Sequence, residues 1–555
     1  MVNFWDFSSW GFFNLTAVLL TSLLVANMLK RSIPWLEASL IPTSVLGGGI
    51  LLVISVIYNN ITGTEFFDTP FFGGQGTAWL ELLTYHMLAL GFTASALKSS
   101  GGKMSKERSI EIFNTGLTTV ATYLLQAFVG MIICIIGARY LTDLLEAAGL
   151  LLALGYGQGP GQAMNYGGIY EMDYGFVGGK SFGLTVASMG FLAASIGGVI
   201  HLNYLKCKGK IVLDKGTGMV GETVEGNNEI PMQESIDKFT VQIALIMVAY
   251  MLAYFLMLVL GNLLPGMRST IYGFNFLLGV LAATLLKTVL NALQKQGIIH
   301  RHYTNDFLLT RATNFFYDIM VTASIAAIRM NIIGKYWAVL LTMGIVGLVV
   351  TYIYVYYVCK KLFPAYAQQQ FLAMYGMLTG TASTGVILLR EIDGDFKTPV
   401  SDNLVYQNFP AMVFGFPILI LATMAPTQPY LTLGIVGAFM VFLNILLFRS
   451  CIFKKKAKEK TTSRLDYPSR EVCCQKVYLP AKQMRPAGLI AARRLFIHSW
   501  FYGTLPQQQG PCCTAYAIET SFPPDVLPVL QTGRVFLAPG GNSSGAAASA
   551  ELPPA

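Results

Sequence analysis

Runs of about 20 mainly apolar residues, the length that an α-helix needs to cross a bilayer, recur along this 555-residue chain. Inside lipid every backbone N–H and C=O must be paired within the protein, so only helices and closed barrels can span the membrane. The expected spans cover residues 12–28, 40–58, 80–97, 110–136, 181–204, 239–264, 271–293, 309–328, 336–358, 403–424 and 431–448. The sequence therefore predicts an all-α polytopic membrane protein.

The composition excludes several other classes of protein. Hydrophobic residues make up 54% of the chain and charged residues 12%, whereas soluble domains carry about 25% charged residues. These values exclude a cytosolic enzyme and a disordered protein. The eight cysteines show no Cys-x-x-Cys spacing, which indicates neither a zinc site nor a disulfide scaffold. The first apolar run lacks a basic start, so we expect it to remain as a span and not to be cleaved as a signal peptide.

Basic residues orient the spans, because lysine and arginine accumulate on the cytoplasmic side. Lys30 and Arg31 follow the first span, and further lysines follow the third and fifth spans. The alternate loop at residues 59–79 contains no lysine or arginine. We therefore expect the N-terminus outside and the C-terminus in the cytoplasm. The net charge of +9 marks the cytoplasmic face, and no nucleic-acid partner is expected.

Two glycine-rich stretches, residues 148–179 and 364–390, fit neither a plain span nor a free loop. The charge bias of all the other loops is satisfied if both stretches enter and leave the membrane from one side. The first is then a re-entrant hairpin from outside. The second is a re-entrant hairpin from inside, as its flanking residues Lys360, Lys361 and Lys397 require.

Two halves of the chain repeat the same plan from opposite sides. Each half is expected to hold four spans, a re-entrant hairpin and one more span, and Glu-x-Asp-x-x-Phe occurs at residues 171–176 and again at 391–396. Such a 5+5 inverted-topology repeat is typical of secondary transporters. The expected domains are a first membrane repeat at 1–204, a cytoplasmic linker at 205–238, a second membrane repeat at 239–428, a final transmembrane helix at 429–453 and a disordered cytoplasmic tail at 454–555.

The first hairpin contains the segment GYGQGPGQAMNYGG at residues 155–168. Four glycines and a proline within seven residues cannot continue a helix, so backbone groups are freed inside the membrane. Freed carbonyls and amide side chains suit Na⁺, and the N–H groups of a broken helix suit a carboxylate. The alternative is a tight turn that only packs helices. The expected substrate-binding residues are Gln158, Gly159, Gln162 and Asn165, and the expected Na⁺ ligands are Gly157 and Gly161.

The second hairpin contains the segment YGMLTGTASTG at residues 375–385. Its hydroxyls can coordinate Na⁺ and donate to a carboxylate, or alternatively bond back to helix carbonyls. The expected substrate-binding residues are Thr379, Thr381, Ser383 and Thr384, and Gly380 is an expected Na⁺ ligand.

Other polar residues lie inside predicted spans. Asp318 lies inside a predicted span, where an acid is costly. It is expected to bind Na⁺, to pair with an arginine such as Arg311, or to reach water near the end of the span. Gln126 is expected to hold helices together.

The order of these motifs resembles the bacterial sodium/glutamate symporter family. The likeness covers about residues 12–454 and is carried by IPTSVLGGG at 41–49, the first hairpin, GLTVASMGF at 183–191, and GMLTGTASTG at 376–385 with the following Arg390 and Glu391. It implies Na⁺-coupled uptake of glutamate, a homodimer, and a hairpin-bearing transport domain that moves against a scaffold. Tyr156 and Gln158 stand where better-known members carry histidine and threonine. This chain thus resembles a divergent member.

The sequence predicts a secondary transporter of the bacterial inner membrane, in contact with lipid, that couples Na⁺ to the uptake of glutamate or a related small carboxylate. Na⁺ is the expected coupling ion, with no organic cofactor and no enzymatic activity. One alternative is an H⁺-coupled transporter of the same architecture, with Asp318 as the proton carrier. Another is an intramembrane hydrolase with Ser383 as nucleophile, for which no histidine lies in either hairpin. A passive channel is a third.

Overall fold

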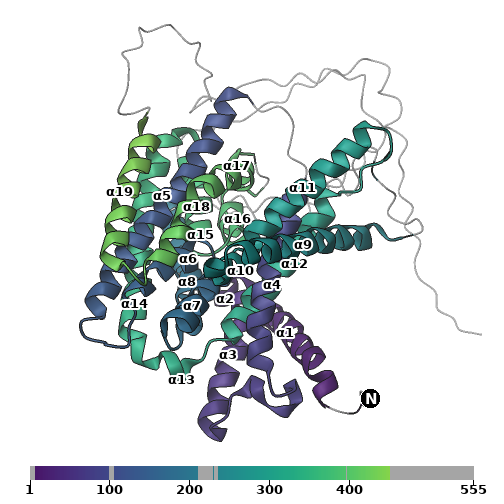
Figure 1. Ribbon diagram of the computed structural model, residues 1–555. Helices are drawn as coiled ribbons and strands as arrows, with labels where there is room; N and C mark the ends of the chain where they lie inside the picture. The colour runs from purple at the N-terminus through teal and green to yellow at the C-terminus, as the bar shows by residue number, and fades with distance from the viewer. Residues whose placement is uncertain are drawn as a thin grey trace, which may run out of the picture. The chain divides into compact units, whose positions relative to one another are not determined.

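The computed structural model describes residues 5, 7–98, 105–209, 229, 236–394 and 397–449. All regular elements in these ranges are helical, apart from an isolated bridge between Glu229 and His302. Figure 1 shows the helices in chain order from purple to green. They are α1 (Phe7–Ser32), α2 (Pro34–Ala38), α3 (Thr43–Thr62), α4 (Gly76–Leu97), α5 (Lys106–Gly137), α6 (Leu151–Gly157), α7 (Pro160–Tyr174), α8 (Gly179–Cys207), α9 (Lys238–Leu263), α10 (Arg268–Gly273), α11 (Asn275–Lys295), α12 (Asp306–Ala326), α13 (Met330–Ile333), α14 (Trp337–Leu362), α15 (Ala367–Thr379), α16 (Ala382–Arg390), α17 (Val400–Tyr406), α18 (Asn408–Met424) and α19 (Pro429–Leu447).

Nine helical segments of the described chain are long and apolar enough to cross a membrane. The bent pair of α17 and α18, which meet at 47°, adds a tenth span if the two are counted together. The protein is therefore an all-α, multi-pass membrane protein, as the apolar runs predict. The nine segments are Ser9–Ser32, Thr43–Thr62, Pro70–Leu97, Lys106–Gly137, Gly179–Cys207, Lys238–Leu263, Asn275–Lys295, Met330–Leu362 and Pro429–Leu447.

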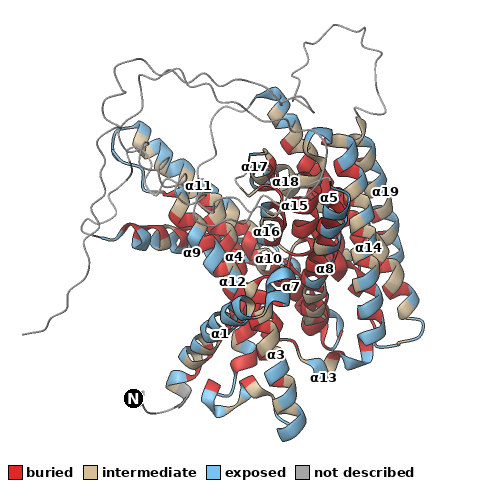
Figure 2. Ribbon diagram, turned by 180° about the vertical axis from the view of Figure 1, so that it is seen from behind, coloured by how far each residue is buried: buried red, intermediate tan, exposed pale blue. Residues whose placement is uncertain are grey.

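Burial separates central helices from peripheral ones. In the most apolar window of each helix, 61% of α8 and 56% of α5 are buried, against 22% of α1, α9 and α19. Figure 2 shows the same contrast, with buried residues gathered on α5, α8 and α15 and exposed residues along the outer helices. In a bilayer the exposed apolar faces of the outer helices are the surfaces that lipid covers.

Several helix contacts can be paired according to the repeat that the sequence predicts. The contact of α1 with α3 corresponds to the contact of α9 with α11. In the same way, the contact of α3 with α12 corresponds to the contact of α11 with α4. Around the interrupted stretches, the contact of α5 with α6 corresponds to the contact of α14 with α15. The contact of α8 with α14 corresponds to the contact of α18 with α5. Three further contacts join elements that are equivalent under the predicted repeat: α4 with α12, α5 with α14, and α6 with α15.

Several helix boundaries differ from the expected spans. The seventh expected span is divided at Phe274 into α10 and α11, and the tenth is bent at Gln407 between α17 and α18. α12 forms a helix where the eighth span is expected, but it is not among the nine apolar segments. Most of the expected linker at 205–238 and all of the expected tail at 454–555 lie outside the described residues.

Candidate functional site

The first interrupted stretch consists of a short 3₁₀ turn (Glu146–Leu150) followed by α6, a break and α7. α6 ends at Gly157, and the chain turns at Gly159, whose φ of +88° is a conformation that glycine adopts most readily. α7 then begins at Pro160, the helix position where a missing N–H costs least. Gly159 is buried, yet a Cβ added to it would meet no atom within 4 Å. The break therefore borders open space inside the protein.

Gln162 lies in the first turn of α7, directly after this break. Its side chain is 1% exposed, and both its amide oxygen and its amide nitrogen lack a hydrogen-bond partner. An unpaired buried amide costs about 1–3 kcal/mol per group. Buried polar groups without partners are rare enough in proteins that each calls for an explanation, such as a bound solute or ion.

The other residues expected at the first break have more ordinary surroundings. Asn165 donates to the Gly273 carbonyl of α10 over 3.2 Å, and Gln158 is half-buried at the break. Gly157 and Gly161 lie against neighbouring side chains, those of Tyr123 and Leu88. The Gly157 carbonyl oxygen faces α5, where it accepts from the Tyr123 hydroxyl.

The second interrupted stretch is made of α15 and α16, joined at Gly380 and Thr381. The Thr379 hydroxyl donates to the Tyr375 carbonyl one turn earlier, over 2.7 Å. Thr381 caps α16, because its hydroxyl accepts from the Thr384 N–H over 3.4 Å. Ser383 is exposed beside them. Two of the four hydroxyls thus have backbone partners, and the cluster borders an accessible surface at Ser383.

The first helices of the two interrupted stretches meet around α5 and α8. α6 packs against α15, and both pack against α8. At Gly190 of α8, an added Cβ would lie 2.3 Å from the Thr379 carbonyl oxygen and 3.0 Å from the Tyr156 ring. Only a residue without a side chain lets the ends of α6 and α15 come this close to α8.

Two side chains of α5 each donate a hydrogen bond to a backbone carbonyl, one in the first interrupted stretch and one in the second. The Tyr123 hydroxyl donates to the Gly157 carbonyl over 2.9 Å. The Gln126 amide donates over 2.9 Å both to the Leu378 carbonyl and to the Thr351 hydroxyl of α14. The Gln126 amide oxygen is buried beside Gly157 without a partner. Gln126 does join helices, as expected, but its position between the two breaks could be found only from the structure.

Asp318 is not brought to either break by any interaction within the described residues. Its side chain is exposed and lies near the Ser44 hydroxyl in the first turn of α3. One turn further on, the Thr322 hydroxyl donates to the Ser44 carbonyl over 3.1 Å. An acid near the positive N-terminal end of a helix is electrostatically favourable.

The described residues contain no group of three or more histidine, cysteine, aspartate or glutamate side chains that could hold a metal ion. Any cation at the two breaks would instead be bound by carbonyl, amide and hydroxyl oxygens, which suit hard ions. No protein-family model matches the chain, and no curated protein matches it significantly.

Proposed function

We propose that this protein is a secondary transporter that couples Na⁺ to the uptake of a small carboxylate, glutamate or a close relative, into the cell. The observation that carries the proposal is Gln162, a fully buried amide without partners at the start of a broken helix. A transported solute that supplies both a donor and an acceptor would satisfy this amide while bound. Such a group is unpaired only when the site is free.

The ends of the broken helices supply complementary charges for two solutes. α7 and α16 begin at the breaks, so their free N–H groups and positive dipole ends favour a carboxylate. α6 and α15 end there, so their last carbonyls favour a cation. This arrangement supports the assignment of Gln158, Gly159, Gln162 and Asn165 together with Thr379, Thr381, Ser383 and Thr384 to the substrate. Gly157, Gly161 and Gly380 are assigned to Na⁺.

The architecture that we propose is an inverted 5+5 repeat with two oppositely oriented re-entrant hairpins, followed by α19. The matched helix contacts between the two halves support it, because a two-fold related pair of repeats requires such pairing. The Glu-x-Asp-x-x-Phe motif, repeated at residues 171–176 and 391–396, supports it too.

The remaining features of the proposal rest on the family resemblance and on the placement of charge. They are a bacterial inner membrane, an external N-terminus and a cytoplasmic C-terminus, a homodimer, and a hairpin-bearing transport domain. Na⁺ is the coupling ion, and no organic cofactor or catalytic step is required. Each solute raises the affinity of the other, because linkage is reciprocal.

The test is a binding and counter-flow assay on the full chain in proteoliposomes, with a panel of labelled amino and dicarboxylic acids. We expect the affinity for the carboxylate to fall about 5- to 150-fold when choline replaces Na⁺, which is the usual range of coupling between two sites. Gln162→Leu should abolish binding. Gln296→Leu, the same change at an exposed residue after α11, should leave binding unchanged. Binding that ignores Na⁺ but follows pH would instead support proton coupling.

A further inference from the structure

A stripe of polar residues runs along α5, from its first turns toward the two breaks. Glu111, Thr115 and Thr119 are four residues apart and therefore share one helix face. The facing residues on α15 and α17 are also polar, although this interface lies inside the helix bundle. Five uncharged polar side chains of this seam are at most 2% exposed: Thr115, Thr119, Gln370, Asn403 and Gln407.

Hydrogen bonds connect the seam across the three helices. The Thr119 hydroxyl donates to the Gln407 amide oxygen over 2.9 Å. The Gln370 amide donates to the Thr115 hydroxyl over 3.4 Å, and the Asn403 amide donates to the Gln370 amide oxygen over 3.2 Å. The last two bonds are long for N–H···O contacts, whose usual distance is about 2.9–3.0 Å.

One acceptor in the seam is left without any donor. Asn403 is 0% exposed, and its amide oxygen has no hydrogen-bond partner. The Tyr366 hydroxyl, which lies beside Glu111 and Asn403, is also buried without a well-formed hydrogen bond. These two atoms, with the Gln370 amide oxygen and the Glu111 carboxylate, place several oxygens in one region.

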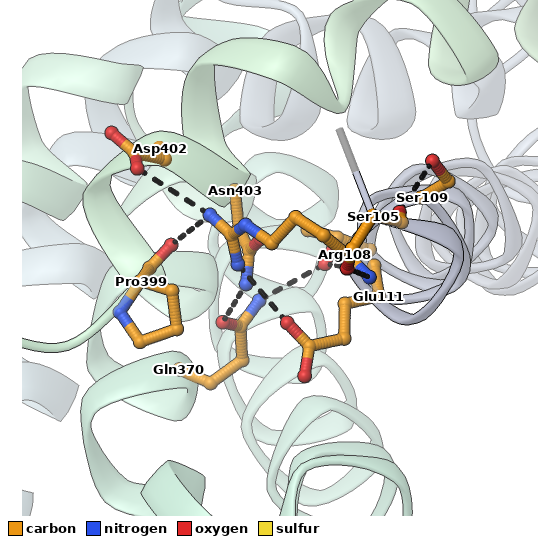
Figure 3. A network of polar contacts seen from close by, with 9 residues as sticks. Ser105, Arg108, Ser109, Glu111, Gln370, Pro399, Asp402 and Asn403 are labelled. Carbon is orange, nitrogen blue, oxygen red and sulfur yellow. Dashed lines mark hydrogen bonds and ion pairs between the residues drawn. The ribbon is translucent and has the colours of Figure 1, made fainter. Parts of the chain in front are cut away.

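Arg108 closes the outer end of the seam (Figure 3). Its Nη1 lies 3.0 Å from the Glu111 carboxylate. Its Nη2 donates to the Pro399 carbonyl over 2.9 Å and lies 3.5 Å from the Asp402 carboxylate of α17. Arg108 is therefore held between two carboxylates from different helices.

We propose that the Glu111 carboxylate and the Asn403 and Gln370 amide oxygens form a binding site for one monovalent cation, Na⁺, with Arg108 as its tethered competitor. One carboxylate with neutral oxygens balances a single positive charge, and hard oxygen ligands suit such an ion. In the structure the guanidinium provides that positive charge. When Na⁺ binds, Arg108 moves to Asp402. This site lies away from the two breaks and does not depend on a carboxylate substrate.

The test is a titration of ²²Na⁺ binding to the full chain, purified in lipid nanodiscs without substrate and with choline as the replacement ion. We expect Glu111→Gln to weaken Na⁺ binding about tenfold or more, because it removes the only charged ligand. We expect Arg108→Gln to tighten binding by about the same factor, because it removes the competing cation. Glu107→Gln is the matched control, since Glu107 is an exposed acid in the same turn of α5.

The direction in which Arg108→Gln changes the Na⁺ affinity distinguishes a cation site from an ion pair that only holds α5 against α17. If Arg108 only fastens α5 to α17, Arg108→Gln lowers the unfolding temperature and leaves Na⁺ affinity unchanged, which overturns the proposal. Absence of Na⁺ binding in the wild-type chain overturns it as well. All variants are repeated in a Gln162→Leu background, which removes the proposed substrate site. Persistence of the Glu111 effect in that background supports this site independently of the transport function.

Discussion

Gln162 and Gln126 are both buried amides, but they stand in opposite situations. Neither polar atom of Gln162 has a partner. The Gln126 nitrogen, by contrast, donates to two acceptors on different helices. Replacing a buried polar group by an apolar one is nearly neutral or stabilising when no partner is left behind, and costly when partners are stranded. We therefore expect Gln162 to bind a solute and Gln126 to stabilise the fold.

The same substitution at these two positions should have opposite effects on stability. We expect Gln162→Leu to leave the unfolding temperature of the solute-free protein unchanged or to raise it, while substrate binding is lost. Gln126→Leu should destabilise the protein by about 1–3 kcal/mol, because the Leu378 carbonyl and the Thr351 hydroxyl lose their donor. Thermal unfolding of both variants in one detergent measures the difference. Marked destabilisation by Gln162→Leu would contradict a binding role.

The sequence identifies individual residues of the site only where their neighbours in the chain form an unusual pattern. Gln162 could be selected because it follows Gly159 and Pro160, which break the helix whatever surrounds them. Tyr123 gave no such signal, because a tyrosine within an apolar span is unremarkable. Its hydrogen bond to Gly157 joins residues 34 positions apart, and no local pattern indicates that they meet.

At the scale of elements, α8 is the helix on which both interrupted stretches rest. α6, α7, α15 and α16 all pack against it. The tight contact at Gly190 fixes how near the end of α15 and the Tyr156 ring can approach. The geometry of both breaks thus depends on one position in a helix that carries none of the expected site residues.

A methyl group at Gly190 should therefore disturb the site from a distance. We expect Gly190→Ala to destabilise the protein by about 1–3 kcal/mol through overpacking and to weaken substrate binding. Gly434→Ala is the matched control, because a Cβ at that helical position of α19 meets no atom within 4 Å. The control should be neutral or stabilising by about 0.5–1 kcal/mol. Equal effects of the two variants on stability and binding would show that the contact at Gly190 is unimportant.

The sequence predicts the number and type of the helices well, but it predicts less well where a helix bends or is divided. Apolar runs of about 20 residues predict membrane helices directly. The bend at Gln407 was missed, although Pro410 and Pro417 lie just beyond it, because proline is tolerated in membrane helices. The division at Phe274 has no proline, and the glycine before it, Gly273, is a weak signal because glycine is frequent in membrane helices.

At the scale of the whole molecule, the sequence gives the least information about which helices contact one another. The repeated Glu-x-Asp-x-x-Phe motif and the alternating charge of the loops indicate two related halves. The contacts of α3 with α12 and of α11 with α4 all join residues more than 150 positions apart, such as Thr322 and Ser44. A span's apolar composition does not specify its neighbour, because lipid and helix interiors are similarly apolar.

The central claim is that two broken hairpins enter the membrane from opposite faces and enclose one site for Na⁺ and a carboxylate. Sided labelling with a membrane-impermeant thiol reagent in intact cells tests it most directly, after subtraction of wild-type labelling. Exposed residues flank the first hairpin at Tyr140 and Val177, and the second at Ala365 and Lys397. We expect Tyr140→Cys and Val177→Cys to react from outside, and Ala365→Cys and Lys397→Cys to react only after the cells are opened. Reaction of the two flanks of either hairpin from different sides would contradict the account.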